Sequence, residues 1–192
     1  ACIVVVAFSM LMNMFYSEWI VPLFNKQTPL EEGELRNAIE KFANRAGFKL
    51  NNIYVIDGSK RSTKANAYFS GLGPKKRIVL YDTLIDDLST EEIVAVLAHE
   101  IGHYKHKHTW QMMGVSVMNT VLMFFLLSLV LDSSVLAEAM GGSTPSFPLA
   151  LVAFGLLYTP LELLTGIGIN ALSRRNEYQA DAFAASFGLA NA

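Results

Sequence analysis

Two histidines and a glutamate, His99, Glu100 and His103, lie within one short segment of the chain. If this segment is helical, His99 and His103 lie one turn apart on the same face, so both rings can bind one metal ion. Glu100 then points aside and can reach a water molecule on that ion. Zinc lowers the pKa of a bound water to about 7, and a carboxylate can take its proton as the water attacks a peptide carbonyl.

The segment reads HEIGH, which is the HExxH pattern of zinc peptidases. The alternative is a pair of solvated or core histidines with an incidental glutamate. Residues 94–98, just before His99, are all apolar. The motif therefore falls in a buried helix. Burying an ionisable group there costs free energy, so its presence indicates a functional role. This context favours the metal site.

A catalytic zinc needs a third protein ligand and an open fourth position. The four histidines all lie between residues 99 and 108, so a downstream acid must serve as the third ligand. Glu177 is the best candidate, because it follows an apolar run that returns the chain to the side of HEIGH. Asp181 lies on the same helical face and can fix the tautomer of a ligand imidazole by accepting its hydrogen bond. The alternative is that these acids form surface ion pairs with Arg174, which the presence of HEIGH disfavours.

His106 and His108 lie in a lysine-rich stretch at the end of the HEIGH helix. We expect a solvated cluster there, because positive charge is favourable at a helix C-terminus. The alternative is a bridging role for His106, which is three residues from His103.

A small α+β segment, residues 25–109, should hold the motif. A helix is expected from about Glu32 to Gly47, and the spacing from Ser89 to Glu92 predicts a capping box that opens the HEIGH helix. Three β-rich runs predict a sheet of about three strands. These runs are Asn52–Ile56, 65–70 and Arg77–Tyr81.

The remaining chain is unusually apolar. Hydrophobic residues make up 52% of the chain and charged residues 17%, against about 45–50% and 25% in a typical soluble domain. Residues 110–131 carry no charge, and residues 147–172 carry only Glu162, with Pro160 beside it. Both runs exceed the length of about 20 residues that a membrane-spanning helix needs. Residues 1–24 are interpreted as the tail of another spanning helix.

The charges predict how these segments are oriented. Lysines and arginines gather in residues 25–109 and again at Arg174 and Arg175, whereas the loop 132–146 has none. The positive-inside rule then places residues 25–109 and 173–192 on the cytosolic side. The net charge of −2 gives no indication of nucleic-acid binding, and the single cysteine, Cys2, excludes an intrachain disulfide. The predicted fold class is a mainly α membrane protein with a small α+β catalytic domain.

Several longer motifs, in this order along the chain, extend the comparison beyond HEIGH. They are PLFNKQTPLEEGEL, IYVIDGSKRSTKANAYFSG, KRIVLYDTLI, VLAHEIGHYKHKHT and SRRNEYQADAFA. Together they resemble the type I CAAX prenyl endopeptidases, which are integral-membrane zinc proteases. The resemblance implies spanning helices around a chamber, closed by a gluzincin-like catalytic domain. It also implies zinc ligation by His99, His103 and Glu177, and a catalytic base at Glu100.

The same resemblance implies that Asp181 supports a ligand histidine and that Asn66 holds the substrate backbone beside an edge strand. Strand addition is a common way to bind an extended peptide. The alternative for Asn66 is an ordinary polar residue at a strand edge. The earlier helices of the family, and a C-terminal segment that supplies a histidine and an arginine, have no counterpart here. We therefore expect the chain to be part of a longer protein.

The function implied is the removal of the last residues of prenylated CAAX-type proteins by a zinc endopeptidase in the lipid bilayer. The expected membrane is that of the endoplasmic reticulum in a eukaryote, or the cytoplasmic membrane in a bacterium. One alternative is a membrane quality-control protease of the heat-shock type. Another is a non-catalytic scaffold stabilised by zinc, which Glu100 disfavours because a structural site needs no general base.

Overall fold

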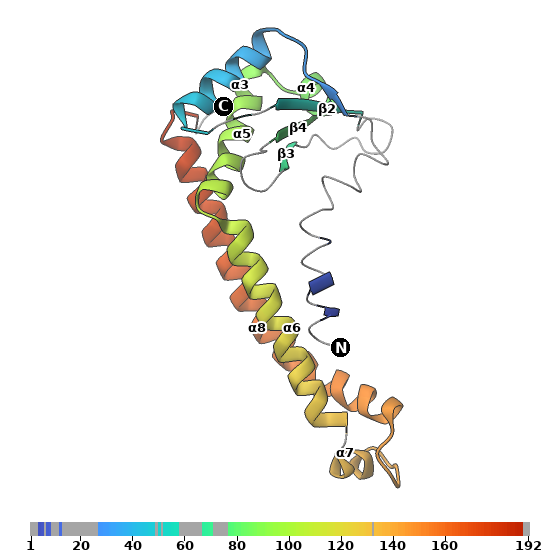
Figure 1. The fold of residues 1–192 in the computed structure, drawn as a ribbon. Coiled ribbons are helices and arrows are strands. Elements are labelled where there is room, and N and C mark those ends of the chain that lie inside the picture. The colour runs from blue at the N-terminus through green and yellow to red at the C-terminus, as the bar shows by residue number, and fades with distance from the viewer. Residues whose placement is uncertain are drawn as a thin grey trace. The chain divides into compact units, whose positions relative to one another are not determined.

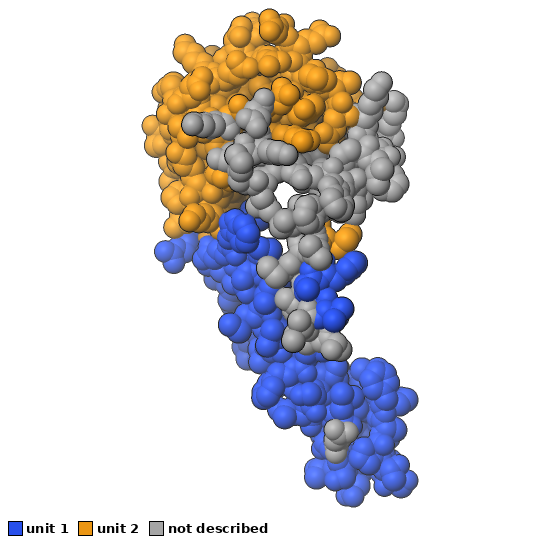
Figure 2. Space-filling view, in the orientation of Figure 1, with its two compact units in different colours: residues 1–8, 109–175 blue, residues 9–108, 176–192 orange. Residues whose placement is uncertain are grey.

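The computed structural model describes residues 4, 5, 7, 8, 12, 27–48, 50, 52–57, 67–70, 77–131 and 133–189. The chain forms two compact units, which Figure 2 shows in different colours. One unit holds residues 1–8 and 109–175, and the other holds residues 9–108 and 176–192. The predicted fold class is confirmed, since the described chain is mainly helical, with two candidate spanning helices and a small sheet.

Four strands form the sheet of the second unit, in the order β1-β2-β4-β3. Their bounds are Gln27–Pro29 for β1, Asn52–Ile56 for β2, Ala67–Ser70 for β3 and Arg77–Tyr81 for β4. The central strands β2 and β4 are parallel, while β1 and β3 pair antiparallel on the outside. Strand β3 is therefore an edge strand among the described residues.

Strand β1 is an addition to the predicted sheet of about three strands. It is three residues long and ends in Pro29, so it carries neither the alternation nor the composition of a strand. A proline is tolerated there because β1 lies at the edge of the sheet, where its missing N–H interrupts no central ladder.

Three helices accompany the sheet, as Figure 1 shows. They are α3 (Glu34–Arg45), α4 (Asp82–Asp87) and α5 (Thr90–Lys105). Helix α5 is the HEIGH helix, and it contacts α3, α4 and β3. The core consists mainly of aliphatic side chains from α3, α5 and the sheet, and the chain at the end of α8 adds Phe183 and Phe187 to it. The HEIGH helix is thus a central helix of a protein core.

The other unit contains most of α6 (His108–Leu131), all of α7 (Ser134–Ala139) and α8 (Phe147–Ala185) up to residue 175. Helices α6 and α8 are long and apolar enough to cross a membrane. In the most apolar 18-residue stretch of each, 0% of α6 and 11% of α8 is buried inside the structure. A core helix of a soluble protein would be mostly buried, so these helices offer their apolar side chains to another environment.

Two predicted segments look different in the structure. The stretch 132–146, expected as a short loop, contains the six-residue helix α7. Helix α8 continues through Pro160 and past residue 172, so the predicted spanning segment and the segment after it belong to one helix of 39 residues. Most of the expected spanning helix in residues 1–24 lies outside the described residues.

Candidate metal centre

Helix α5 begins with the predicted capping box. The Ser89 hydroxyl oxygen accepts a hydrogen bond from the Glu92 amide at 3.3 Å, and the Glu92 carboxylate accepts one from the Ser89 amide at 2.7 Å. The Ser89 hydroxyl also donates to the Glu92 carboxylate at 2.7 Å. The bond from the Ser89 amide and, to a lesser extent, this hydroxyl bond hold the pKa of Glu92 below its usual value. Further along the helix, Ile93, Leu97 and Ile101 are fully buried. The helix that carries HEIGH is therefore fixed both at its end and along one face.

Three possible ligand atoms converge in the second unit. The Nε2 atoms of His99 and His103 lie 3.0 Å apart. The Oε2 atom of Glu177 lies 3.2 Å from the first and 3.4 Å from the second. Among the described residues, these three side chains form the one group of histidine, cysteine or acidic residues that could hold a metal ion.

These distances fit a zinc ion. Zinc binds histidine nitrogen and carboxylate oxygen at about 2.0–2.2 Å in a tetrahedron, whose ligand atoms are then about 3.3–3.6 Å apart. The observed separations of 3.0–3.4 Å are close to those edges. Three protein ligands leave the fourth position open, as catalytic zinc sites do. The side chain of Glu177 is itself half exposed.

Asp181 lies where the sequence suggested. Its Oδ1 atom accepts a hydrogen bond from Nδ1 of His99 at 2.7 Å. With the proton on Nδ1, the Nε2 atom of His99 carries a free lone pair. That lone pair points at the group formed with His103 and Glu177, so the contact with Asp181 prepares His99 to bind a cation.

His108 contradicts the expectation of a solvated cluster. Its side chain is buried, with a residue exposure of 3%, and its Nδ1 atom lies 3.0 Å from Nδ1 of His103. Helix α5 ends at Lys105, and Lys107 adopts a left-handed φ of 57°. This turn breaks the helical path and brings His108 back against His103. His106, by contrast, is exposed, as expected.

Gly102 lets helices α5 and α8 approach closely at the site. A Cβ atom on Gly102 would lie 2.9 Å from Cα and 3.1 Å from the carbonyl oxygen of Ala180. Both are backbone atoms, so the clash could not be relieved by a side-chain rotation. Ala180 lies between Glu177 and Asp181, and the glycine thus allows both acids to reach His99. Sequence reasoning had assigned Gly102 no role.

Burial also affects the charges of the site. It raises the pKa of Glu100, an effect that His99 opposes and Glu177 reinforces. It lowers the pKa of His103, while Glu177 raises it. Both effects of burial follow from the cost of removing a charge from water. The lowered pKa of His103 favours its neutral form, which is the form that binds a metal.

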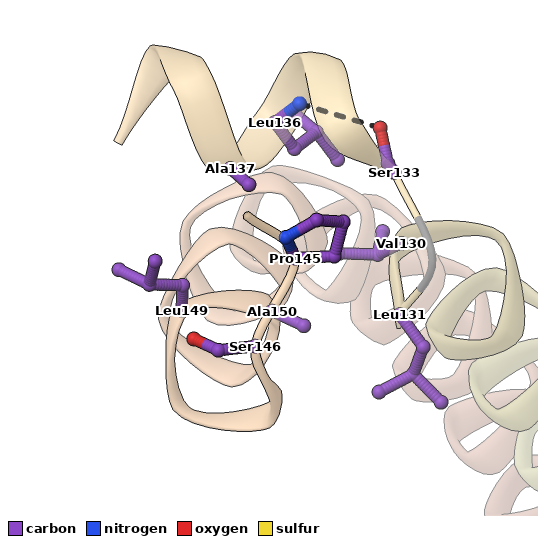
Figure 3. A pocket seen from close by; sticks show the side chains of 9 residues that line it. All are labelled: Val130, Leu131, Ser133, Leu136, Ala137, Pro145, Ser146, Leu149 and Ala150. Atoms are coloured by element: carbon purple, nitrogen blue, oxygen red, sulfur yellow. Dashed lines mark hydrogen bonds between the residues drawn. The ribbon is translucent and has the colours of Figure 1, made fainter. Parts of the chain in front are cut away.

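Asn66 lies outside the described residues, directly before β3. A separate hollow lies in the other unit, between the end of α6, the helix α7 and the start of α8 (Figure 3). Its nine lining residues include no ionisable side chain, and Ser133 uses its hydroxyl oxygen to cap α7. This hollow therefore offers no group for acid–base or metal chemistry.

The chain is similar to known peptidases. The model of peptidase family M48 matches residues 29–192. CAAX prenyl protease 1 of Saccharomyces cerevisiae is 45% identical over 88% of this chain and 41% of its own length. The CAAX prenyl protease 1 homolog of Arabidopsis thaliana is 45% identical over 95% of this chain and 43% of its own.

A solved structure is also similar. The crystal structure of S. mikatae Ste24p matches with a TM-score of 0.83 and 41% sequence identity. The match covers 97% of this chain and 47% of that one. This chain thus spans less than half the length of these relatives. With the HEIGH site and the family match over most of its residues, the chain belongs to peptidase family M48.

Proposed function

We propose that this chain carries the zinc site of a membrane metalloendopeptidase that acts on CAAX-type proteins. The observation that supports this most is the convergence of His99, His103 and Glu177 at 3.0–3.4 Å, with Glu100 next to the first ligand. Membership of peptidase family M48 implies a metal cofactor, and the donor set of two imidazoles and a carboxylate favours zinc.

His99, His103 and Glu177 would hold the ion. When bound, zinc polarises a carbonyl and lowers the pKa of a coordinated water to about 7. Glu100 would accept the proton of the attacking water at its carboxylate and pass it to the leaving amine. Burial raises the pKa of Glu100 towards neutral pH. A group whose pKa lies near the working pH can both take and return a proton. Asp181 would hold the His99 ring through its Nδ1–H.

The proposed substrate is the C-terminal part of a CAAX-type protein, prenylated or not. Several relatives bear the name CAAX prenyl protease 1. Strand β3 offers an unpaired edge among the described residues, to which an extended peptide can add as a further strand. Asn66, directly before this strand, would hold the substrate backbone. A quality-control protease of the heat-shock type remains the second candidate, which cleavage of unmodified membrane proteins would favour.

We also propose that α6 and α8 cross the membrane, with the zinc site on the cytosolic side. Helix α6 has 24 residues and is about 36 Å long, enough to cross a hydrocarbon core of about 30 Å. Its first residue, His108, contacts Gln179 of α8, so both helices have these ends on one side. Cysteine labelling of Ser143→Cys, in the segment between α7 and α8, should then require access from the side opposite HEIGH. The eukaryotic relatives favour the endoplasmic reticulum membrane.

The central test uses the full-length protein with two variants. Glu100→Gln keeps the three ligands and removes the base, so it should retain zinc and lose cleavage of a CAAX peptide. Glu177→Ala removes a ligand and should lose zinc. Metal content is measured by mass spectrometry, and cleavage by the release of the C-terminal residues of the peptide. Normal cleavage by Glu100→Gln would falsify the mechanism, and a wild-type protein without zinc would refute the metal site.

A further inference from the structure

A short hydrogen-bonded chain of side chains leads away from the second histidine of HEIGH. The Nδ1 atom of His103 lies 3.0 Å from Nδ1 of His108. The Nε2 atom of His108 lies 2.9 Å from Oε1 of Gln179, on α8. His108 is almost fully buried, and the ring of His106 stacks on it at a centroid distance of 5.4 Å.

The direction of these hydrogen bonds can be worked out from donors and acceptors. A neutral histidine has one N–H and one lone pair. When the oxygen of Gln179 accepts from Nε2–H of His108, the Nδ1 atom of His108 carries a lone pair. That lone pair can accept only if Nδ1 of His103 carries the proton. His103 then has its own lone pair on Nε2, the atom that faces His99 and Glu177.

The opposite direction would block the site. A proton on Nδ1 of His108 would leave Nδ1 of His103 as the acceptor and put the His103 proton on Nε2. An N–H at that atom cannot bind a cation. This hydrogen-bonded chain of side chains thus has two states, and the amide oxygen of Gln179 selects the state in which His103 can be a ligand.

We propose that His108 and Gln179 are positioning residues that hold His103 in its Nδ1–H tautomer and so keep Nε2 available for the metal. The proposal rests on the metal site of the proposed function and adds a second support to it. Asp181 does for His99 what His108 and Gln179 do for His103. Partners of this kind orient the ring and fix the tautomer of a ligand histidine.

The test measures zinc affinity of the full-length protein in detergent, by competition with a fluorescent chelator after removal of metal. His108→Phe keeps a ring but loses the acceptor, and it should raise the zinc dissociation constant about 10–100-fold. His108→Asn places an amide oxygen near the position of Nδ1, so it should recover most of the affinity. His106→Phe is the matched control, because among the described residues His106 makes no hydrogen bond to His103, and its affinity should stay at the wild-type level.

Gln179 gives an independent pair of variants at a half-buried position. Gln179→Glu can only accept, so zinc affinity should be kept. Gln179→Leu removes the acceptor and should weaken zinc binding. The absorption spectrum of the protein loaded with Co²⁺ provides a second readout, which should change in His108→Phe and Gln179→Leu and remain as in the wild type in His106→Phe. Circular dichroism checks that each variant is folded, and the Gln179 pair decides if His108→Phe does not fold.

Failure of this proposal is distinct from failure of the proposed function. If folded His108→Phe and Gln179→Leu both bind zinc as tightly as the wild type, the proposed tautomer role is overturned. The peptidase proposal would still stand in that case. A folded His108→Asn as weak as His108→Phe would also overturn the tautomer role, because Asn restores the acceptor that Phe lacks. A wild-type protein that binds no zinc would instead overturn the proposed function itself.

Discussion

Helices α5 and α6 follow one another along the chain, and both are rich in apolar residues. Helix α5 buries these residues in the protein, whereas α6 leaves most of them exposed. In α5, Leu97 and Ile101 are 0% exposed and lie in the core with α3 and the sheet. In α6, Phe125 is 58% and Leu129 59% exposed, and His108 is its one fully buried residue. Lys107, in its left-handed conformation, lies between the two helices.

The difference shows what an apolar helix can be used for. Helix α5 is surrounded by protein, so its backbone and the histidines of HEIGH are held in place by the packing of neighbouring elements. Helix α6 offers its apolar residues outward, as a helix in lipid does, where association gains little from apolar contact alone. A metal centre needs side chains in fixed positions, and two of the three residues that could hold a metal come from the helix surrounded by protein.

The largest expected contrast comes from one leucine on each helix. Leu97→Ala should lower the free energy of unfolding by about 2–5 kcal/mol, because it leaves a cavity in a packed core. Leu129→Ala should change it by less than about 0.5 kcal/mol, since that side chain is 59% exposed among the described residues. Unfolding of the full-length protein in detergent, followed by circular dichroism, provides the measurement. Equal losses in the two variants would mean that α6 is packed against protein, and the comparison would fail.

A smaller contrast is expected between two glycines. Gly102→Ala should lower the free energy of unfolding by about 1–3 kcal/mol, because its Cβ would meet the backbone of Ala180 at 2.9 Å and push α8 away from α5. Gly114→Ala in α6 meets no atom within 4 Å, so it should stabilise the helix by about 0.5–1 kcal/mol.

Zinc affinity sharpens this second contrast. The displacement of α8 in Gly102→Ala also moves Glu177 and Asp181 away from His99, so zinc should bind more weakly there and not in Gly114→Ala. Competition with a chelator measures the zinc affinity of both variants. A Gly102→Ala protein with wild-type stability and zinc affinity would show that the close approach of α5 and α8 has no role in forming the site.

Much of the local structure could be predicted because the signals are local. The bounds of β2 and β4 were predicted to the residue, since short β-rich runs end there in turn residues or a new helix. The capping box at Ser89 was confirmed, because its two bonds depend only on a fixed spacing. Strand β1 was missed, because it is defined by pairing with β2 and not by its own sequence.

The site residues, too, were predictable where the signal is local and less so where it depends on distant parts of the chain. His99 and His103 share a face through helical spacing alone, and the structure brings their Nε2 atoms together. Glu177 could be selected only by reasoning about where the chain returns, because it lies far from His103 in the sequence. His108 was wrongly placed in solvent, since a lysine-rich helix end gives no sign of the turn at Lys107 that buries it.

The smallest contrast compares the loss of one hydroxyl group in each helix. Ser89→Ala removes the cap of α5 and should lower the free energy of unfolding by about 1 kcal/mol. Thr120→Ala in α6 also removes a hydroxyl, but that hydroxyl bonds back to the Ser116 carbonyl within its own helix. Such a bond adds little to a helix, so the change should stay within about 0.5 kcal/mol.

The pH dependence sharpens this last comparison. The pKa of Glu92 is lowered in the folded protein by its bonds to Ser89, so their contribution is present at neutral pH and is lost as the pH falls through that pKa. Ser89→Ala loses the bond that the hydroxyl donates to the carboxylate and keeps the backbone one. The difference in the free energy of unfolding between wild type and Ser89→Ala should therefore narrow in acid, whereas the effect of Thr120→Ala should not change. A difference that persists unchanged below that pKa would mean that the bond from the Ser89 hydroxyl to the Glu92 carboxylate adds nothing to stability. The hydroxyl would then act only by accepting a hydrogen bond from the Glu92 amide.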